Sequence, residues 1–360
     1  MTKLLPGLLL ALLLALAGQY LSHFIGIELM SLPKSPVSAI LVAILLGIIV
    51  RNTLPLPRVI DPGIAFSLKR VLRFGIVLLG IRLSLGEVGA IGVRSLPVIV
   101  IAAGSALLVV TALSRRFGLG SRLGTLIAVG TSICGATAIV ATAPAIGARD
   151  QEVAYSIACI TIFGVLAMVC YPFLAHMVFS GNAFAAGLFL GTSVHETAQV
   201  AGAGLVYQEL YSDPRALDVA TVTKLVRNLG MLIVIPLMSV LYHRRDDVEG
   251  EAPGLLSMVP LFVVGFALMS LLRTVGDIGP LAFGLIERDL WSTLVGYTRE
   301  LAEISLAVAM AAVGLNTRIG ELMQLGLRPF AVGLFAAALV GVVAVVMIFA
   351  VSAIGFIDAA

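Results

Sequence analysis

Long apolar runs separated by short polar breaks recur along the whole chain. Most runs approach about 20 residues, the length an α-helix needs to cross the hydrocarbon core of a bilayer. The pattern predicts an all-α polytopic membrane protein that forms a single transmembrane domain over residues 1–360. About eleven spans are expected, at 4–22, 37–51, 71–84, 95–113, 122–147, 153–178, 183–208, 217–242, 255–273, 296–315 and 329–356.

Small polar residues interrupt two of these runs. The stretches "GTSICGATAIVA" (130–141) and "GTSVHETAQVA" (191–201) share Gly-Thr-Ser followed by a β-branched residue. We predict discontinuous helices there, which a membrane tolerates where the broken backbone lines a cavity or is buried in protein. Free amides at broken helix ends attract anions, so Thr131, Ser132, Thr192 and Ser193 are candidate binding residues. Close helix packing through small residues is the alternative interpretation.

A second repeat joins distant parts of the chain. "GIRLSLGEVGAIGVR" (80–94) and "GLNTRIGELMQLGLR" (314–328) share Gly, Gly-Glu, Gly and Arg at the same spacing. An odd number of predicted spans separates the two copies, so they are expected on opposite faces of the membrane. This predicts inverted repeats around 71–113 and 296–350, an arrangement common in secondary transporters. Taken singly, these residues also suit loop geometry and snorkelling at the interface.

The composition supports a membrane protein and excludes several other classes. Sixty per cent of the residues are hydrophobic and 12% are charged, whereas about a quarter of a soluble domain is charged. The net charge is only +3, and no basic block indicates a nucleic-acid partner. The three cysteines have no C-x-x-C spacing. No G-x-x-x-x-G-K-[ST] motif is present, and we expect no cofactor, no direct drive by ATP and no enzymatic activity.

The distribution of basic residues predicts the orientation. Cytoplasmic loops are enriched in Lys and Arg, and most of the basic residues that flank the predicted spans fall on the side of the N-terminus. We therefore predict a cytoplasmic N-terminus and an external C-terminus. The first apolar run follows Lys3 and resembles a signal peptide, but we expect it to be retained as a span because it continues to Tyr20.

The run at 217–242 contains two basic residues at predicted membrane depth. Lys224 and Arg227 are one helical turn apart, and Asn228 shares a face with Lys224. A cation at the centre of a bilayer helix costs about 2.5–3.5 kcal/mol on insertion scales. We predict that these three residues bind an anion, because Arg offers a planar fork for oxyanions and Lys a point charge. The alternative places both cations near the external end, where they would snorkel.

The pair His195-Glu196 has the first half of the zinc motif H-E-x-x-H. The position of the second ligand holds Gln199, and an amide is a poor zinc ligand, so no metal is expected. A carboxylate and an imidazole beside a cationic stripe could serve as counter-charges or carry a proton. A helix cap is compatible with this role, since Ser193 and Glu196 match the capping pattern S-x-x-E.

At "GTSICGATAI", "GTSVHETAQVAGAG" and "TKLVRNLGMLIVIP", the chain resembles the YeiH-type family of bacterial inner-membrane proteins named as sulfate exporters. The resemblance runs from the second predicted span to the last. It implies an inner-membrane location and a sulfate or sulfonate substrate. It also implies a distant likeness to carriers of the cation-proton antiporter and bile-acid symporter type, which have crossed discontinuous helices.

Together these features predict a secondary carrier that moves a small anion by alternating access. A proton is the coupling ion for which the sequence offers a place, at His195 and Glu196. An anion channel is the first alternative, and an intramembrane hydrolase using the same pair is the second. The expected partners are a small inorganic or organic anion and membrane lipid, with a homodimer as the expected assembly and no nucleic acid.

Overall fold

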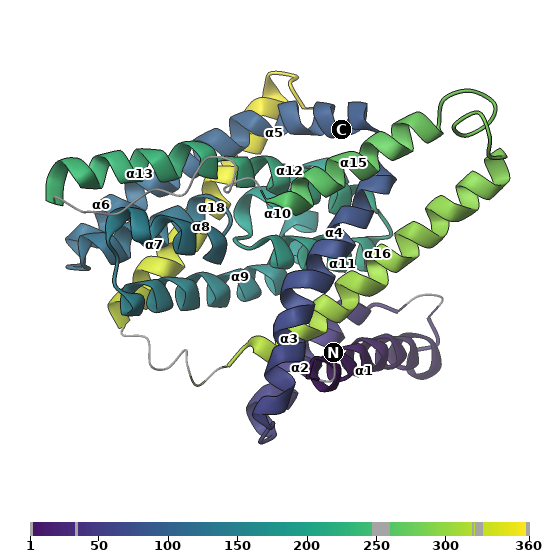
Figure 1. Ribbon diagram of the computed structural model, residues 1–360, viewed down its shortest axis with the longest axis horizontal. Helices are drawn as coiled ribbons and strands as arrows, with labels where there is room; N and C mark the ends of the chain where they lie inside the picture. The colour runs from purple at the N-terminus through teal and green to yellow at the C-terminus, as the bar shows by residue number, and fades with distance from the viewer. Residues whose placement is uncertain (1–2, 33–34, 247–259, 319, 321–326, 358–360) are drawn as a thin grey trace. The chain divides into compact units, whose positions relative to one another are not determined.

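The computed structural model describes residues 3–32, 35–246, 260–318, 320 and 327–357. Over these residues the chain is almost entirely helical (Figure 1), with one isolated antiparallel bridge between Ala282 and Ile286 and no strand. The main helices are α1 (Leu5–His23), α2 (Ala39–Thr53), α3 (Asp61–Phe66), α4 (Leu72–Leu79), α5 (Leu85–Ser105), α6 (Thr111–Arg116), α7 (Ser121–Ser132), α8 (Ala136–Thr142), α9 (Asp150–Val178), α10 (Ala183–Ser193), α11 (Thr197–Tyr211), α12 (Arg215–Leu229), α13 (Met231–Asp246), α15 (Leu261–Gly276), α16 (Arg288–Asn316) and α18 (Leu327–Ala353).

The described part of each predicted apolar run is mostly helical. Short π-helical segments join α3 to α4 and α5 to α6, so each pair forms one continuous helix. Within the described residues, five helical stretches are long and apolar enough to cross a membrane by length and composition: Leu5–Leu29, Leu85–Arg116, Asp150–Val178, Arg215–Tyr242 and Arg328–Ala353. The chain is thus a multi-pass membrane protein, and the number of spans stays a prediction.

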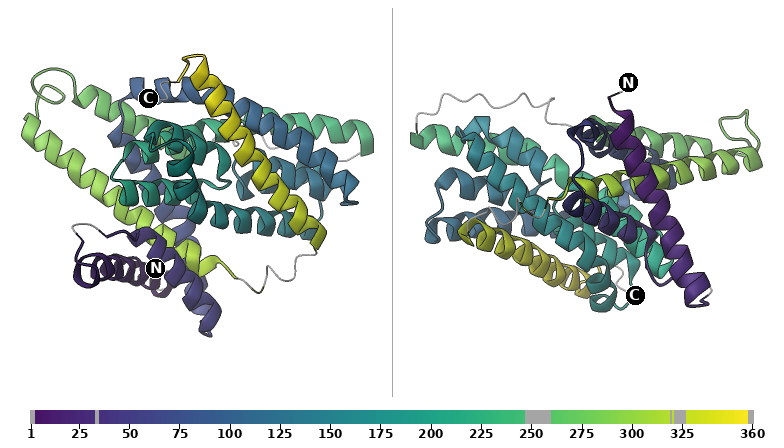
Figure 2. Two further views of the ribbon diagram at one scale, coloured as in Figure 1. Left: turned by 180° about the vertical axis from the view of Figure 1, so that it is seen from behind. Right: turned by 90° about the horizontal axis from the view of Figure 1, so that it is seen from below.

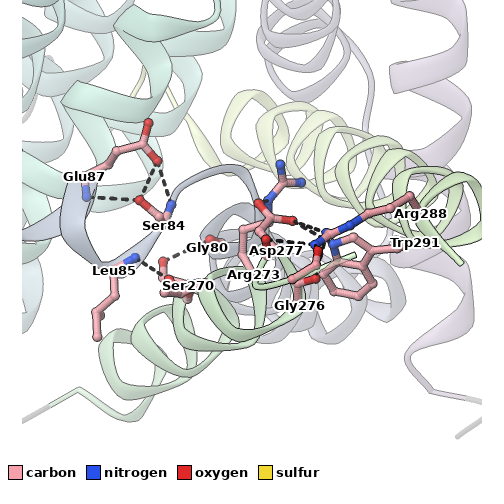
Figure 3. A network of polar contacts seen from close by, with 12 residues as sticks. Gly80, Ser84, Leu85, Glu87, Ser270, Arg273, Gly276, Asp277, Arg288 and Trp291 are labelled. Carbon is pink, nitrogen blue, oxygen red and sulfur yellow. Dashed lines mark hydrogen bonds and ion pairs between the residues drawn. The ribbon is translucent and has the colours of Figure 1, made fainter. Parts of the chain in front are cut away.

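The first copy of the predicted inverted repeat differs from the expected loop. The turn lies at Leu83 and Ser84, and α5 begins at Leu85. The Glu87 carboxylate accepts hydrogen bonds from the Ser84 N–H (2.7 Å) and hydroxyl (2.8 Å), and the Ser84 hydroxyl oxygen accepts one from the Glu87 N–H (3.2 Å). These bonds form a capping box, which Figure 3 shows. In the second copy, Glu321 and Gly326 lie outside the described residues, so the inverted relation stays a prediction.

By its internal contacts the chain divides into two compact units, although the sequence predicts one domain. Unit 1 comprises Met1–Ile91, Gly204–Asp218 and Leu261–Ile319. Unit 2 comprises Gly92–Ala203, Val219–Pro260 and Gly320–Ala360. Three helices, α5, α11 and α12, therefore contribute residues to both units.

Unit 1 is built around α1, α2 and α16, which pack against one another (Figure 2). The backbones of α2 and α16 approach closely at Gly47 and Gly314. A Cβ atom on Gly314 would lie 2.2 Å from the Ile44 carbonyl oxygen and 3.0 Å from the Gly47 Cα. Small residues at such a crossing allow membrane helices to pack backbone to backbone.

The variant Gly314→Val should therefore melt at a lower temperature than the wild-type protein in detergent. The added side chain must force α2 and α16 apart, and overpacking of this kind costs about 1–3 kcal/mol or more. Gly296→Val is the matched control on the same helix, because a Cβ atom at Gly296 meets nothing within 4 Å. Equal melting temperatures for the two variants would contradict the close packing of α2 and α16.

The connection between α15 and α16 is held by a polar clamp in unit 1 (Figure 3). Arg288 donates to the carbonyl oxygens of Gly276 (3.0 Å), Asp277 (2.9 Å) and Gly279. The Asp277 carboxylate accepts from Arg273 Nε (2.6 Å) and from Trp291 Nε1 (2.8 Å). The clamp satisfies carbonyls at the C-terminal end of α15, which have no partner within the helix.

A partly buried ion network also lies within unit 1. Arg82 is paired with Asp218 (2.6 Å) and Glu303 (2.9 Å). Gln208 accepts from Arg82 (3.2 Å) and donates to Glu303 (2.9 Å). The network ties the end of the α4 stretch to α11, α12 and α16.

Unit 2 contains both helix interruptions, the one between α7 and α8 and the one between α10 and the start of α11. The long helices α9 and α18 pack against each other and against α10 (Figure 2, left). Apolar residues of α7, of the first break and of α8 form a core with α13, comprising Val129, Ile133, Cys134, Ala138, Met231, Val234 and Ile235. This packing holds the end of α7, the first break and the start of α8 against α13.

Candidate functional site

Both Gly-Thr-Ser stretches end a helix, as the sequence predicts. α7 ends at Ser132 and α8 begins at Ala136, while α10 ends at Ser193 and α11 begins at Thr197. Gly135 lies in the first break with a φ of 74°, a conformation that glycine adopts without steric cost. The last carbonyl groups of α7 and α10 receive no hydrogen bond from an N–H group of their own helix. They therefore need donors from elsewhere in the protein.

Arg227 on α12 supplies donors to both helix ends. Its Nε donates to the Ser132 carbonyl oxygen (2.9 Å), and one terminal nitrogen donates to Thr131. The other terminal nitrogen donates to the carbonyl oxygens of Thr192 (2.5 Å) and Val194 (3.1 Å). A single guanidinium group thus joins α7 to α10.

Lys224, one turn earlier on α12, joins the two breaks in the same way. Its Nζ donates to the carbonyl oxygens of Ile133 (3.0 Å), Val194 (3.0 Å) and His195. Lys224 is 0% exposed and Arg227 is 3% exposed. Both cations are therefore buried among backbone carbonyls, and the snorkelling alternative is wrong.

The two Gly-Thr-Ser stretches contact the cations at matching positions. The carbonyl groups of Thr131 and Thr192 both accept from Arg227, and those of Ile133 and Val194 both accept from Lys224. The weak sequence similarity of the two stretches thus corresponds to an equivalent local structure. The atoms differ from those predicted, since these residues lie at C-terminal helix ends and present carbonyl groups instead of free amides.

Several buried polar atoms beside this arrangement have no hydrogen-bond partner within the described part of the chain. They are the hydroxyls of Thr131, Thr192 and Thr223, Oδ1 of Asn228 and both ring nitrogens of His195. The backbone of Ser193 lies near the His195 ring. A buried polar group left unpaired costs about 1–3 kcal/mol, so a polar ligand or water at this place would stabilise the protein.

The remaining predicted binding residues already have partners. The Ser132 hydroxyl donates to the Val129 carbonyl oxygen (3.0 Å), and the Ser193 hydroxyl donates to that of Phe189 (2.6 Å). The amide nitrogen of Asn228 donates to the Thr197 hydroxyl (3.2 Å). The side chains available to a ligand are thus those of Thr131, Thr192, His195 and Asn228, with Thr223 in addition.

Thr161 on α9 is hydrogen-bonded to Glu196 in the second break and to Gln199 on α11. The Thr161 hydroxyl is hydrogen-bonded to a carboxylate oxygen of Glu196 (3.1 Å). Gln199 accepts from the Glu196 N–H (3.1 Å) and donates to the Thr161 carbonyl oxygen (3.1 Å). Gln199 thus caps α11, whereas the capping pattern in the sequence assigned the cap to Ser193. A Cβ atom on Gly164 would lie 1.9 Å from the side-chain amide oxygen of Gln199, so a larger residue on α9 would displace the Gln199 side chain.

The described residues do not complete the zinc motif that begins with His195 and Glu196. Among the described residues, no group of three or more His, Cys, Asp or Glu side chains is placed to hold a metal ion. The Gln199 amide is engaged with Glu196 and Thr161. The arrangement instead consists of two buried cations, one carboxylate and a set of unpaired polar groups.

Comparison with known proteins places the chain in a family. The family described as Conserved hypothetical protein 698 matches residues 6–333. The UPF0324 membrane protein SAG1125 of Streptococcus agalactiae is 33% identical over 341 residues, 94% of this chain and 95% of the relative. The UPF0324 membrane protein FN0533 of Fusobacterium nucleatum is 33% identical over 350 residues, 95% of this chain and 97% of the relative.

A UPF0324 membrane protein of Bacillus cereus is 30% identical over 344 residues, which cover 96% of this chain and 94% of the relative. No solved structure matches the chain. The family match and these relatives extend over nearly the whole sequence, including both Gly-Thr-Ser stretches and α12. The chain belongs to the UPF0324 family of membrane proteins, which is the same family as the YeiH-type proteins that its motifs resemble.

Proposed function

We propose that the protein is a secondary carrier that moves a small anion across the bacterial inner membrane by alternating access. The observation that carries the proposal is the burial of Lys224 and Arg227 beside polar groups that lack partners. The Glu196 carboxylate lies in the second break, where it is hydrogen-bonded to Thr161. The two positive charges of Lys224 and Arg227 therefore exceed its single negative charge. Buried charge is costly unless it is paired, and an anion would supply the missing partner.

The anion would bind chiefly through neutral donors, in the field of the two cations. All three N–H groups of Lys224 are directed to carbonyls. Arg227 has five N–H groups, of which four donate to carbonyl oxygens and one is left. That N–H, the hydroxyls of Thr131 and Thr192 and the His195 ring offer a short set of donors, which suits an anion as small as sulfate or a sulfonate.

Broken helices support a carrier more than a channel. Irregular backbone at membrane depth lines cavities or lies inside protein, and discontinuous helices form the substrate sites of many secondary transporters. Sulfate and sulfonates are the candidates that the family resemblance supplies. His195 and Glu196 stand as the proposed proton carriers, and the cytoplasmic N-terminus and external C-terminus belong to the same proposal.

Counterflow in proteoliposomes separates the carrier from its rival. Vesicles loaded with unlabelled sulfate or methanesulfonate should take up the labelled anion faster than empty vesicles, and the initial rate should saturate with external anion. A channel would give flux that rises linearly with concentration and gains nothing from internal anion. Protein-free vesicles provide the background.

Thr192→Val should weaken anion binding about tenfold, or about 1.4 kcal/mol. Valine keeps the shape of the side chain but removes a hydroxyl that has no partner among the described residues, so the stability of the fold should be unchanged or slightly higher. Thr142→Val is the matched control, because the Thr142 hydroxyl is also buried and unpaired but lies at the other end of α8. Titration of sulfate by calorimetry checks both variants. Wild-type affinity in Thr192→Val would remove this hydroxyl from the site.

A further inference from the structure

We infer that the fixed charges of this site match a monovalent oxyanion, and that a divalent oxyanion binds only together with a proton on Glu196. The inference rests on the proposed function and specifies which anions the same site accepts. Its basis is the hydrogen bonding of three charged side chains in unit 2: Lys224, Arg227 and Glu196.

The geometry fixes both positive charges. Lys224 donates to three carbonyl oxygens, and three donors require the ammonium form, because a neutral amine has only two N–H groups. Arg227 remains protonated in proteins, and it too is surrounded by carbonyl oxygens. Neither group can release its proton without turning a lone pair towards a carbonyl oxygen. Two permanent positive charges therefore lie in the interior of unit 2.

Glu196 is the group that can change its charge. The Thr161 hydroxyl can donate to its carboxylate or accept from its carboxylic acid, so the contact survives in both protonation states. Two titratable side chains interact electrostatically with Glu196. They are Lys224 on α12 and Cys134 in the first break. Its other neighbours are neutral: Gln199 on α11, and the backbone of Gly135 and Ala136 at the start of α8.

His195 precedes Glu196 in the chain, and it is the remaining titratable side chain of the two breaks. His195 is 0% exposed, and it interacts electrostatically with both Lys224 and Arg227. A protonated imidazole would add a third positive charge to a buried site, which burial strongly disfavours. Of the two proposed proton carriers, Glu196 is therefore the one that takes up the proton and balances a change in the valence of the bound anion.

The charge balance follows directly. With Glu196 ionised, one positive charge is in excess, and a bound monoanion makes the site neutral. A dianion would leave one net negative charge in a medium of low dielectric constant, which is costly. When Glu196 takes up a proton on one carboxylate oxygen, two positive charges are in excess and a dianion restores neutrality. The loaded site is neutral in both cases, so sulfate should be carried with one proton and a sulfonate with none.

Calorimetric titration of wild-type protein and Glu196→Gln with sulfate and with methanesulfonate tests the inference. In the wild-type protein, sulfate affinity should fall with rising pH by up to about tenfold per pH unit, since binding takes up one proton. Methanesulfonate affinity should stay constant over the same range. In Glu196→Gln, sulfate affinity should no longer depend on pH, and sulfate should bind more tightly than methanesulfonate.

Glu152→Gln is the matched control, because Glu152 is also a buried glutamate of unit 2 but pairs with Arg149 at the start of α9. It should keep the wild-type selectivity and pH profile. The inference would be overturned if the ratio of sulfate to methanesulfonate affinity were the same in Glu196→Gln as in the wild-type protein. The proposed anion transport would not be affected by that result. Failure of both anions to bind wild-type protein would instead overturn the proposed function, and the inference with it.

Discussion

Arg227→Gln is expected to lower the melting temperature of the protein sharply and to abolish anion binding. The shorter amide cannot reach the carbonyl groups of Thr131, Ser132, Thr192 and Val194 together. Each buried carbonyl group that loses its donor costs about 1–3 kcal/mol, and whole proteins are stable by only about 5–15 kcal/mol. Thermal denaturation in detergent, with and without sulfate, measures both effects.

Arg227→Lys keeps the experiment informative if the glutamine variant does not fold. Lysine preserves the positive charge but has three donors and no planar fork, so it should fold with reduced stability and bind sulfate more weakly than the wild-type protein. If Arg227→Gln folds normally and retains wild-type affinity for sulfate, the anion site lies elsewhere.

Lys224→Met should produce the second large effect, a loss of anion affinity of about a hundredfold or more, since truncating a buried charge pair costs about 2–5 kcal/mol. Methionine matches the length of lysine but leaves the carbonyl groups of Ile133 and His195 without donors, while the Val194 carbonyl keeps its bond from Arg227. It also removes the excess positive charge, because Arg227 and ionised Glu196 then balance. Equilibrium binding of methanesulfonate measures the loss.

The double variant Lys224→Met with Glu196→Gln separates charge from structure. It restores one excess positive charge without restoring the hydrogen bonds of Lys224, so methanesulfonate affinity should recover in part while the melting temperature stays low. No recovery of affinity in a double variant that folds would show that Lys224 acts through structure alone.

The apolar pattern predicted the helical runs, the two interruptions and the pair of cations in α12. It could not show which end of a broken helix each Gly-Thr-Ser stretch occupies, because small residues suit either end. That uncertainty led to the prediction of free amides at Thr131 and Thr192, where the structure has carbonyl groups. The capping box of Ser84 and Glu87 is local and matches S-x-x-E, so the sequence contained a signal that was missed.

The long-range contacts had no local signal. Thr161 lies on α9, and its bonds to Glu196 and Gln199 span more than thirty positions. The pairing of Arg82 with Glu303 spans 221 positions. Such contacts depend on how helices pack, and hydrophobic periodicity identifies a buried helix face without identifying its partner.

The central claim is that a small oxyanion binds where Lys224 and Arg227 join the two broken helices. Anomalous diffraction from crystals grown with selenate, a heavier analogue of sulfate, tests it most directly. We predict an anomalous peak within hydrogen-bond reach of the Thr131 and Thr192 hydroxyls and the His195 ring, and a weaker peak at the same place in crystals of Arg227→Lys grown in the same way. A selenate peak elsewhere in the protein, with none beside these residues, would contradict the account.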